Sequence, residues 1–320
     1  MADKGLDVLD KYDFEVKQTS RGRGVMLINT DKGPKLLKEY TGSGKYIEWI
    51  AGILEEVNHS GKLAVDAYVP NKEGEYISTS ADGARYVVKE WYDCRDCDVK
   101  NFGDIILSVR ALAILHNELE RCEKGDVKCR IKTIGDEMKR HNSEILRVKK
   151  YLAKRNNRSD FEILAAGWCD SFYVEGQKAI EELERLRPEL GASKGICHGS
   201  YNYHNICFGF HLPVVINFEK MHYDYLMCDL YGIMRKLMEK YDWDIKLAYR
   251  FMTEYDKIRP LNENDLNLLG IMFSFPEKFW KLMNAYNNSR KTWIPVKNLE
   301  KLRRVIEQND RRLEFISTIH

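Results

Sequence analysis

The chain has 320 residues, of which 44% are hydrophobic and 31% are charged, as expected for an ordinary globular protein. Lysine and arginine number 51 against 49 aspartates and glutamates, a formal net charge of +2, so no bulk field favours nucleic acid or an anionic membrane. The N-terminus lacks the apolar core of a signal peptide, and the longest nearly apolar run, 105–115, is shorter than a bilayer span and contains Arg110. We therefore expect a cytoplasmic protein with no nucleic-acid partner and no membrane span.

Strand and helix patterns alternate over residues 1–92, which we predict to form one lobe. Short apolar runs broken by Gly, Pro and Asp turn signals predict strands, and apolar residues at helical spacing predict a helix. The predicted order is β-β-β-α-β-β, a five-stranded sheet plus one helix: strands at 12–20, 24–30, 34–40, 64–70 and 84–92, with the helix within 42–61.

Residues 93–320 are predicted to form a second, mainly helical lobe. Apolar residues recur at helical spacing around 112–119, 145–152, 226–237 and 245–255. Only 195–220 interrupts this pattern, with two apolar runs that predict a hairpin ending in a β run at Val214–Phe218. The expected fold class is α+β.

Eight cysteines in a cytosolic chain are expected to stay reduced. Cys94 and Cys97 have the spacing of a redox motif or of half a zinc site, but no second such pair accompanies them. Two surface cysteines on a linker are the simpler interpretation.

Phosphoryl transfer from ATP needs a loop and a lysine for the phosphates, carboxylates or amides for Mg²⁺, and a base near the attacking hydroxyl. The turn with Arg21, Gly22 and Gly24 suits a loop that covers phosphates, and a plain hairpin turn explains it equally well.

Lys38, on the third predicted strand, is the candidate phosphate lysine. Its predicted ion-pair partner is Glu48 on the following helix, with Glu55 or Glu56 as substitutes. A solvated surface lysine is the alternative.

Three later segments carry a resemblance: H-G-S-Y-N-Y-H-N at 198–205, V-V-I-N-F-E-K at 214–220 and D-L-Y-G-I-M-R-K-L-M at 229–238. With R-A-L-A-I-L-H at 110–116, they resemble the aminoglycoside-phosphotransferase and choline-kinase-like superfamily, and within it the spore-coat proteins of the CotS type. The resemblance runs from Lys38 to the helix after Asp229. It implies a bilobal protein-kinase-like fold, with a small antiparallel-sheet N-lobe and a large, mainly helical C-lobe.

The catalytic loop of that family reads H-G-D-x-x-x-x-N. His198 and Gly199 match it, Ser200 holds the place of the aspartate base, and Asn205 matches the second metal ligand. Losing a positioned base typically costs about 10²- to 10⁴-fold in rate.

The family's following strand ends in I-D-F-D or a near variant. Asn217 holds the place of its first aspartate, which would bind Mg²⁺, and Glu219 lies two positions on. An amide supplies no negative charge, so the implied cofactors, ATP and Mg²⁺, should bind more weakly. Asp229 matches the aspartate that steadies the loop.

Three side chains near these positions offer compensation. His204 is a candidate replacement base, because an imidazole can take a proton near neutral pH, although a packed or surface histidine is the simpler interpretation. Glu219 and Asp224 are candidates to supply charge to a metal, and an exposed carboxylate in a turn is the simpler interpretation of each.

Two functions stay open. We favour a pseudokinase that keeps the fold as a binding or assembly protein, with nucleotide and spore-coat proteins as the implied partners and the forespore surface or coat as a second implied location. The alternative is an active ATP-dependent phosphotransferase on a small hydroxyl compound such as an amino sugar or amino alcohol. Retention of Lys38, Asn205 and Asp229 supports that alternative.

Overall fold

The computed structural model describes residues 5–22, 25–122, 133–209, 213–289 and 296–319. The chain divides into two compact units that are interleaved in sequence. The first comprises 1–130, 195–223 and 254–259, and the second comprises 131–194, 224–253 and 260–320. The first unit includes residues on both sides of position 92. The lobe boundary expected at that position stays a prediction.

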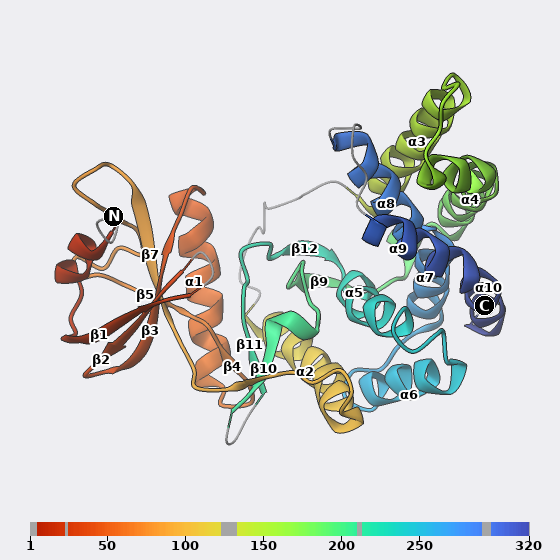
Figure 1. Ribbon diagram of the computed structural model, residues 1–320. Helices are drawn as coiled ribbons and strands as arrows, with labels where there is room; N and C mark the ends of the chain where they lie inside the picture. Colours follow the sequence, from red (N-terminus) through yellow and green to blue (C-terminus); the bar gives the residue numbers. More distant parts are fainter. Residues whose placement is uncertain (1–4, 23–24, 123–132, 210–212, 290–295, 320) are drawn as a thin grey trace. The chain divides into compact units, whose positions relative to one another are not determined.

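An antiparallel sheet forms much of the first unit (Figure 1). Within the described ranges it has six strands in the order β1-β2-β3-β7-β5, with β6 also paired to β7. Its elements, after the short helix η1 (Leu6–Lys11), are β1 (Val16–Arg21), β2 (Met26–Thr30), β3 (Gly33–Glu39), β5 (Tyr68–Val69), β6 (Ser78–Thr79) and β7 (Arg85–Glu90). The sheet thus contains β6, which lies in a stretch that reads as a polar loop because a two-residue strand leaves no alternation to detect.

Helix α1 (Gly44–His59) packs against this region, as predicted. Ser43 caps it by accepting the N–H of Tyr46, which satisfies one of the free donors of the first turn. Its buried face carries Ile47 and Ile50.

A smaller sheet follows the sequence less directly, with the strand order β4 (Ala64–Val65), β11 (Pro213–Val215), β10 (Ile206–Phe208) and β8 (Arg95–Asp96). The predicted hairpin is β10 paired with β11, and β4 joins β11 in parallel, so the fourth predicted strand is divided between two sheets. The remaining elements of the first unit and its junctions are α2 (Phe102–Arg121), β9 (Lys194–Cys197), η3 (Tyr203–Asn205) and β12 (His222–Tyr225).

Pairing of β8 with β10 corrects the expectation for the cysteines. It brings Cys94 beside Cys207, and the two form a disulfide with their Cα atoms 5.7 Å apart. Cys97 is buried rather than on the surface. The C-x-x-C spacing therefore reflects neither a redox pair nor a zinc site, because its first cysteine has a partner 113 positions away.

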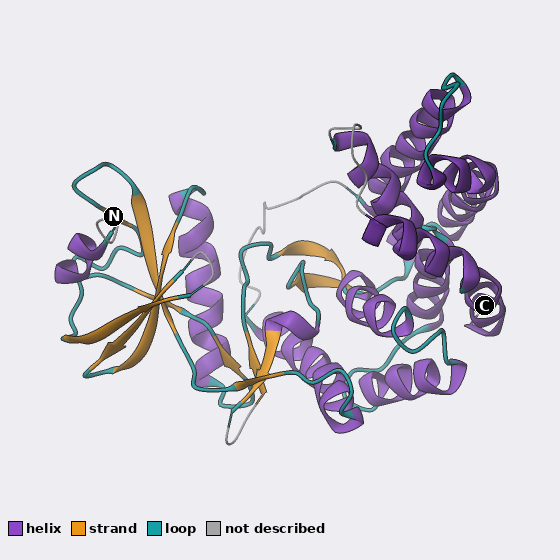
Figure 2. Cartoon of the chain, viewed as in Figure 1, coloured by secondary structure: helices purple, strands orange, loops and turns teal. Residues whose placement is uncertain are grey.

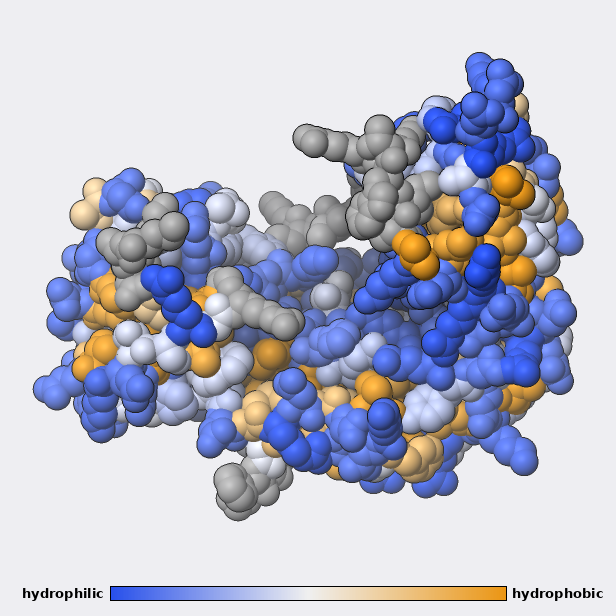
Figure 3. Space-filling view, in the orientation of Figure 1, coloured by the Kyte–Doolittle hydropathy of each residue, from blue (hydrophilic) through white to orange (hydrophobic). Residues whose placement is uncertain are grey.

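The second unit is almost entirely helical (Figure 2). Its core includes Ile145, Val148 and Leu152, which confirms the helical spacing found there. Hydrophilic residues cover the outer end of the first two helices, α3 and α4 (Figure 3). The elements are α3 (Ile134–Ala153), α4 (Asp160–Leu186), η2 (Pro188–Leu190), α5 (Met227–Met238), α6 (Ile245–Asp256), α7 (Glu263–Ser274), α8 (Glu277–Asn288), α9 (Val296–Glu307) and α10 (Asn309–Ile319).

Candidate functional site

Lys38 is bound to a carboxylate, but not to the one expected. From β3 its ammonium donates to Oε1 of Glu219 at 2.8 Å. Glu48 lies on the solvent side of α1 and is exposed, as are Glu55 and Glu56, because the buried side of the helix carries the apolar residues. The prediction that Glu48 pairs with Lys38 is therefore wrong.

A second lysine reaches the same oxygen. Lys89 on β7 lies on the same face of the sheet as Lys38, since Lys38 is paired in register with Val87. Its ammonium lies 2.6 Å from Oδ2 of Asp66 and 3.5 Å from Oε1 of Glu219. We call Lys38, Lys89, Asp66 and Glu219 the lysine–carboxylate cluster.

The two carboxylates of the cluster have opposite electrostatic environments. Burial opposes ionisation of Glu219, but the charges of Lys89 and Lys38 lower its pKa to about 2. Burial dominates at Asp66 and raises its pKa, although Lys89 acts in the other direction. Oδ1 of Asp66 is buried and has no hydrogen-bond partner, so this carboxylate is only half satisfied.

Sequence reasoning missed Lys89 and Asp66. Each is a single charge inside an apolar run, Y-V-V-K-E and A-V-D-A-Y. Opposite charges at buried positions of strands close in sequence indicate a buried ion pair, and that signal was available.

The loop after β9 is held by a buried histidine. Nδ1 of His198 accepts the N–H of Ser200 at 3.1 Å, so its proton lies on Nε2, which donates to the carbonyl of Ile216 at 3.0 Å. Gly199 has φ of +75°, and a Cβ there would lie 2.0 Å from the carbonyl oxygen of Lys220. The loop geometry thus requires both residues that match the family pattern.

Two asparagines occupy the predicted metal positions and bind each other. Nδ2 of Asn217 donates to Oδ1 of Asn205 at 2.9 Å, and Nδ2 of Asn205 donates to the carbonyl of Ser200 at 2.9 Å. The backbone N–H of Asn217, at a φ of +70°, donates to Asp66 at 3.0 Å. The amides therefore join the loop to the segment that follows β11 (Pro213–Val215).

This donor set does not fit Mg²⁺, which proteins bind through carboxylates together with substrate phosphates. The Asn205 oxygen is already used by Asn217, and both carboxylates nearby are paired with lysines. Across the described ranges no group of three or more His, Cys, Asp and Glu side chains is arranged to hold a metal ion.

The other predicted residues lie apart from the cluster or cannot be placed. Arg21 ends β1 and is exposed, and the N–H of Gly22 donates to the carbonyl of Val25 at 2.9 Å, as in a hairpin turn. Gly24 lies outside the described residues. His204 is exposed, and Asp229 is buried at the start of α5 in the second unit.

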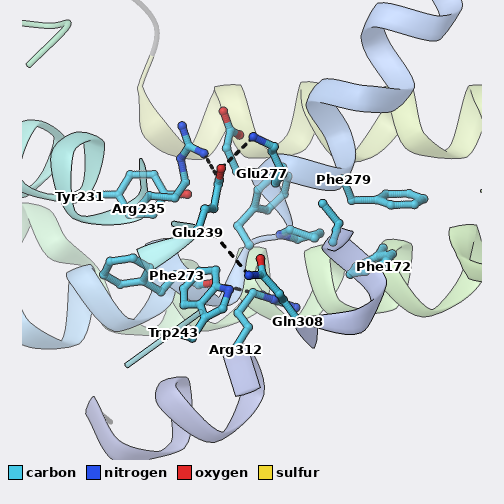
Figure 4. Close-up of a pocket in the computed structure, with 14 residues that line it drawn as sticks. Phe172, Tyr231, Arg235, Glu239, Trp243, Phe273, Glu277, Phe279, Gln308 and Arg312 are labelled. Carbon is cyan, nitrogen blue, oxygen red and sulfur yellow. Dashed lines mark hydrogen bonds and ion pairs between the residues drawn. The ribbon is translucent and has the colours of Figure 1, made fainter. Parts of the chain in front are cut away.

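A separate pocket lies within the second unit. Figure 4 shows Glu239 near its centre, bound to Arg235. Glu239 also forms an ion pair with Lys278 at 2.7 Å. Aromatic rings, including those of Trp243 and Phe273, form much of the remaining wall. Because its charged groups neutralise one another, the pocket presents mainly aromatic faces.

Comparison with solved structures identifies the fold. An aminoglycoside phosphotransferase from Alicyclobacillus acidocaldarius superposes with a TM-score of 0.85 at 16% identity, covering 98% of this chain and 94% of that one. The fold is that of an aminoglycoside phosphotransferase-like kinase. A microcompartment-associated aminopropanol kinase gives 0.64 at 14% identity, covering 98% and 96%, and the amicoumacin kinase hAmiN, in complex with AMP-PNP, gives 0.61 at 17%, covering 96% and 94%. The α+β, kinase-like fold expected from the sequence is confirmed.

Among curated proteins, this kinase-like chain is similar to spore coat protein S of Bacillus subtilis. The two are 21% identical over 98% of this chain and 93% of that protein. The resemblance found in the sequence is therefore confirmed. No family model matches the chain. Within the described ranges, no helix has both the length and the apolar character needed to cross a bilayer.

Proposed function

We propose that this chain is a nucleotide-binding, kinase-like protein whose phosphoryl transfer is impaired, and that it serves as a binding or assembly protein of the spore coat. The observation that carries the first part is Ser200 at the position of the base. The loop 198–205 contains no carboxylate, and Asp66 and Glu219 are both engaged by lysines. A serine hydroxyl is a far weaker base than a carboxylate.

Nucleotide binding is supported by Lys38, by the retained loop and by a fold shared with kinases solved as nucleotide complexes. The coat role is supported by similarity to spore coat protein S over nearly the whole chain. A fluorescently tagged copy in a sporulating host should collect on the forespore. A copy that stays diffuse throughout sporulation would contradict the coat role.

Restoring the missing carboxylates tests the impairment. The double variant Ser200→Asp/Asn217→Asp should hydrolyse ATP or phosphorylate a panel of amino sugars and amino alcohols at least about 10²-fold faster than the natural chain, because a base and a metal charge are returned. Ser200→Ala/Asn217→Ala is the matched control and should show no gain. A natural chain that turns over at about 1–100 s⁻¹, the usual kinase range, and loses this in Lys38→Ala would establish an active enzyme instead.

The active phosphotransferase is the second candidate. Besides Lys38, Asn205 and Asp229, it is supported by the pocket of the second unit, whose aromatic walls suit a small organic molecule. In that case Trp243→Ala should raise KM for the hydroxyl compound while leaving ATP binding unchanged.

A further inference from the structure

One carboxylate oxygen of Glu219 lies between the ammonium groups of two lysines. Oε1 is 2.8 Å from Nζ of Lys38 and 3.5 Å from Nζ of Lys89. Two cations converging on a single anionic oxygen also form a suitable site for a phosphate oxygen, since charge-assisted hydrogen bonds to phosphate and to carboxylate have the same geometry.

The side chain of Glu219 can rotate away from the lysines without movement of the backbone. Its side chain is 27% exposed. Its backbone is held separately, because the hydroxyl of Tyr46 on α1 lies 3.2 Å from the carbonyl of Glu219 and 2.7 Å from that of Met221. Rotation of the carboxylate towards solvent therefore needs no movement of the chain.

The lysines would keep their positions after that rotation. Lys89 is 2% exposed, is bound to Asp66 at 2.6 Å and lies 4.7 Å from the centroid of the Tyr68 ring. Lys38 is 36% exposed and projects from the regular strand β3. Once Glu219 leaves, the cluster of one carboxylate and two lysines carries net positive charge, and its partly exposed member, Lys38, is in contact with solvent.

The two asparagines leave the charge of a bound phosphate to be neutralised by the lysines. A nucleotide phosphate brings negative charge that kinases usually neutralise with Mg²⁺, yet Asn205 and Asn217 are bound to each other and offer no charge to a metal. Here the only positive charge that the cluster brings to a phosphate comes from the lysines. Asp66 holds Lys89 in place, but it does not neutralise the charge of Lys38.

We infer that Lys38 and Lys89 form a phosphate site that binds nucleotide without a divalent cation, and that Glu219 is its internal competitor. The inference rests on the proposed nucleotide binding and adds to it the metal independence and the identity of the competing group. Free phosphates share the recognised chemistry, so the test includes them.

Calorimetric titration of the full chain with ADP, pyrophosphate and inorganic phosphate, each in EDTA and in Mg²⁺, measures the metal dependence. ADP should bind in EDTA with an affinity within about threefold of that in Mg²⁺. Tighter binding of ADP than of pyrophosphate would assign the site to a nucleotide, and equal binding would assign it to free phosphates.

Variants identify the groups. In EDTA, Glu219→Gln should bind ADP about tenfold more tightly, because the competing charge is removed, and Lys38→Met should bind at least about tenfold more weakly. Lys32→Met is the matched control, since it removes an equal charge from an exposed pair with Asp13, and it should bind as the natural chain does. For Lys89, the double variant Asp66→Asn/Lys89→Met avoids leaving a buried charge alone and should also weaken binding.

The outcomes separate the inference from the proposed function. Binding in Mg²⁺ but not in EDTA overturns the inference and leaves nucleotide binding intact. Glu219→Gln binding no more tightly than the natural chain overturns the role of Glu219 as competitor. Absence of ADP binding in every variant and condition overturns both.

Discussion

Both units hold one glutamate between two cationic side chains, but they assemble this arrangement in different ways. In the second unit, Arg235 lies on α5, Glu239 caps the end of that helix four positions later, and Lys278 completes the group. In the first unit, Glu219 meets lysines that are 181 and 130 positions away. A pair one helical turn apart mainly stabilises its own helix. Charged side chains brought together from distant parts of the chain instead indicate a site that the tertiary structure forms.

The two groups also differ in what surrounds them. Glu239 is enclosed by aromatic rings, and its side chain is 15% exposed. Glu219 is more exposed and has beside it a buried carboxylate oxygen without a partner. The network around Glu239 is closed. The network around Glu219 still has an unsatisfied hydrogen-bonding atom, so a ligand can complete it.

Lys89→Met should have the largest effect on stability. It leaves Asp66, whose side chain is 6% exposed, without its cation, and breaking a buried pair costs about 3–5 kcal/mol of unfolding free energy. Denaturant unfolding of this variant and of Asp66→Asn/Lys89→Met measures the cost. The double variant should recover most of the loss, and a loss that it does not recover would mean that Lys89 acts through packing alone.

Removing the disulfide should cost somewhat less and should affect the first unit, where both cysteines lie. Cys94→Ser opens a bridge that spans 113 positions, and such bridges typically contribute about 2–4 kcal/mol. Thermal melts with and without dithiothreitol check this. The natural chain should melt lower in reductant while Cys94→Ser melts at one temperature in both, and a natural chain indifferent to reductant would argue against the bridge.

Acid should remove the stabilising contribution of Glu219. The folded-state pKa of Glu219 is about 2, below its ordinary value of 4.5, so its contribution is present above pH 4.5 and is lost as pH falls towards 2. By linkage that contribution is about 3 kcal/mol. The stability difference between the natural chain and Glu219→Gln should shrink over this window. A difference that stays constant with pH would show that the ion pairs with Lys38 and Lys89 are not formed in solution.

Lys236 provides the smallest test, next to the closed network of the second unit. Burial and the neighbouring charge of Arg235 lower its pKa to about 8 from 10.5. The protonated lysine therefore reduces stability below pH 8, and this cost fades as pH rises from 8 to 10.5. Lys236→Met should be more stable at pH 7 by less than ~1 kcal/mol, because solvent screens a half-buried group. A gain that persists unchanged at pH 10.5 would have another cause.

Much of the fold could be predicted because its signals are local. The meander of β1 to β3, helix α1 and the hairpin of β10 and β11 all follow from alternation, helical spacing and turn residues. The strands β6 and β8 could not be predicted, since two residues show no period. Their backbone pairing depends on neighbours that are remote in sequence.

The candidate site was likewise predictable only in part from the sequence. The match to a family pattern selected Lys38, His198 and Asn205 but assigned them to two lobes, whereas all three lie in the first unit. Their roles in phosphoryl transfer stay predictions. The partner of Lys38 was assigned to Glu48 by analogy, whereas the fold supplies Glu219. Likewise, the spacing of Cys94 and Cys97 suggested a local motif, and strand pairing instead joined Cys94 to Cys207.

Because the two units are interleaved in sequence, the residues of the lysine–carboxylate cluster are synthesised at different times. During synthesis, Asp66 and Lys89 emerge early and can pair with each other, but Lys38 must wait for Glu219. About 130 residues separate Lys89 from Glu219, and at roughly 5–20 residues per second a ribosome needs on the order of ten seconds to make them. For that interval Lys38 lacks the carboxylate that neutralises it in the finished fold, so the unfinished sheet displays one unneutralised lysine of the cluster.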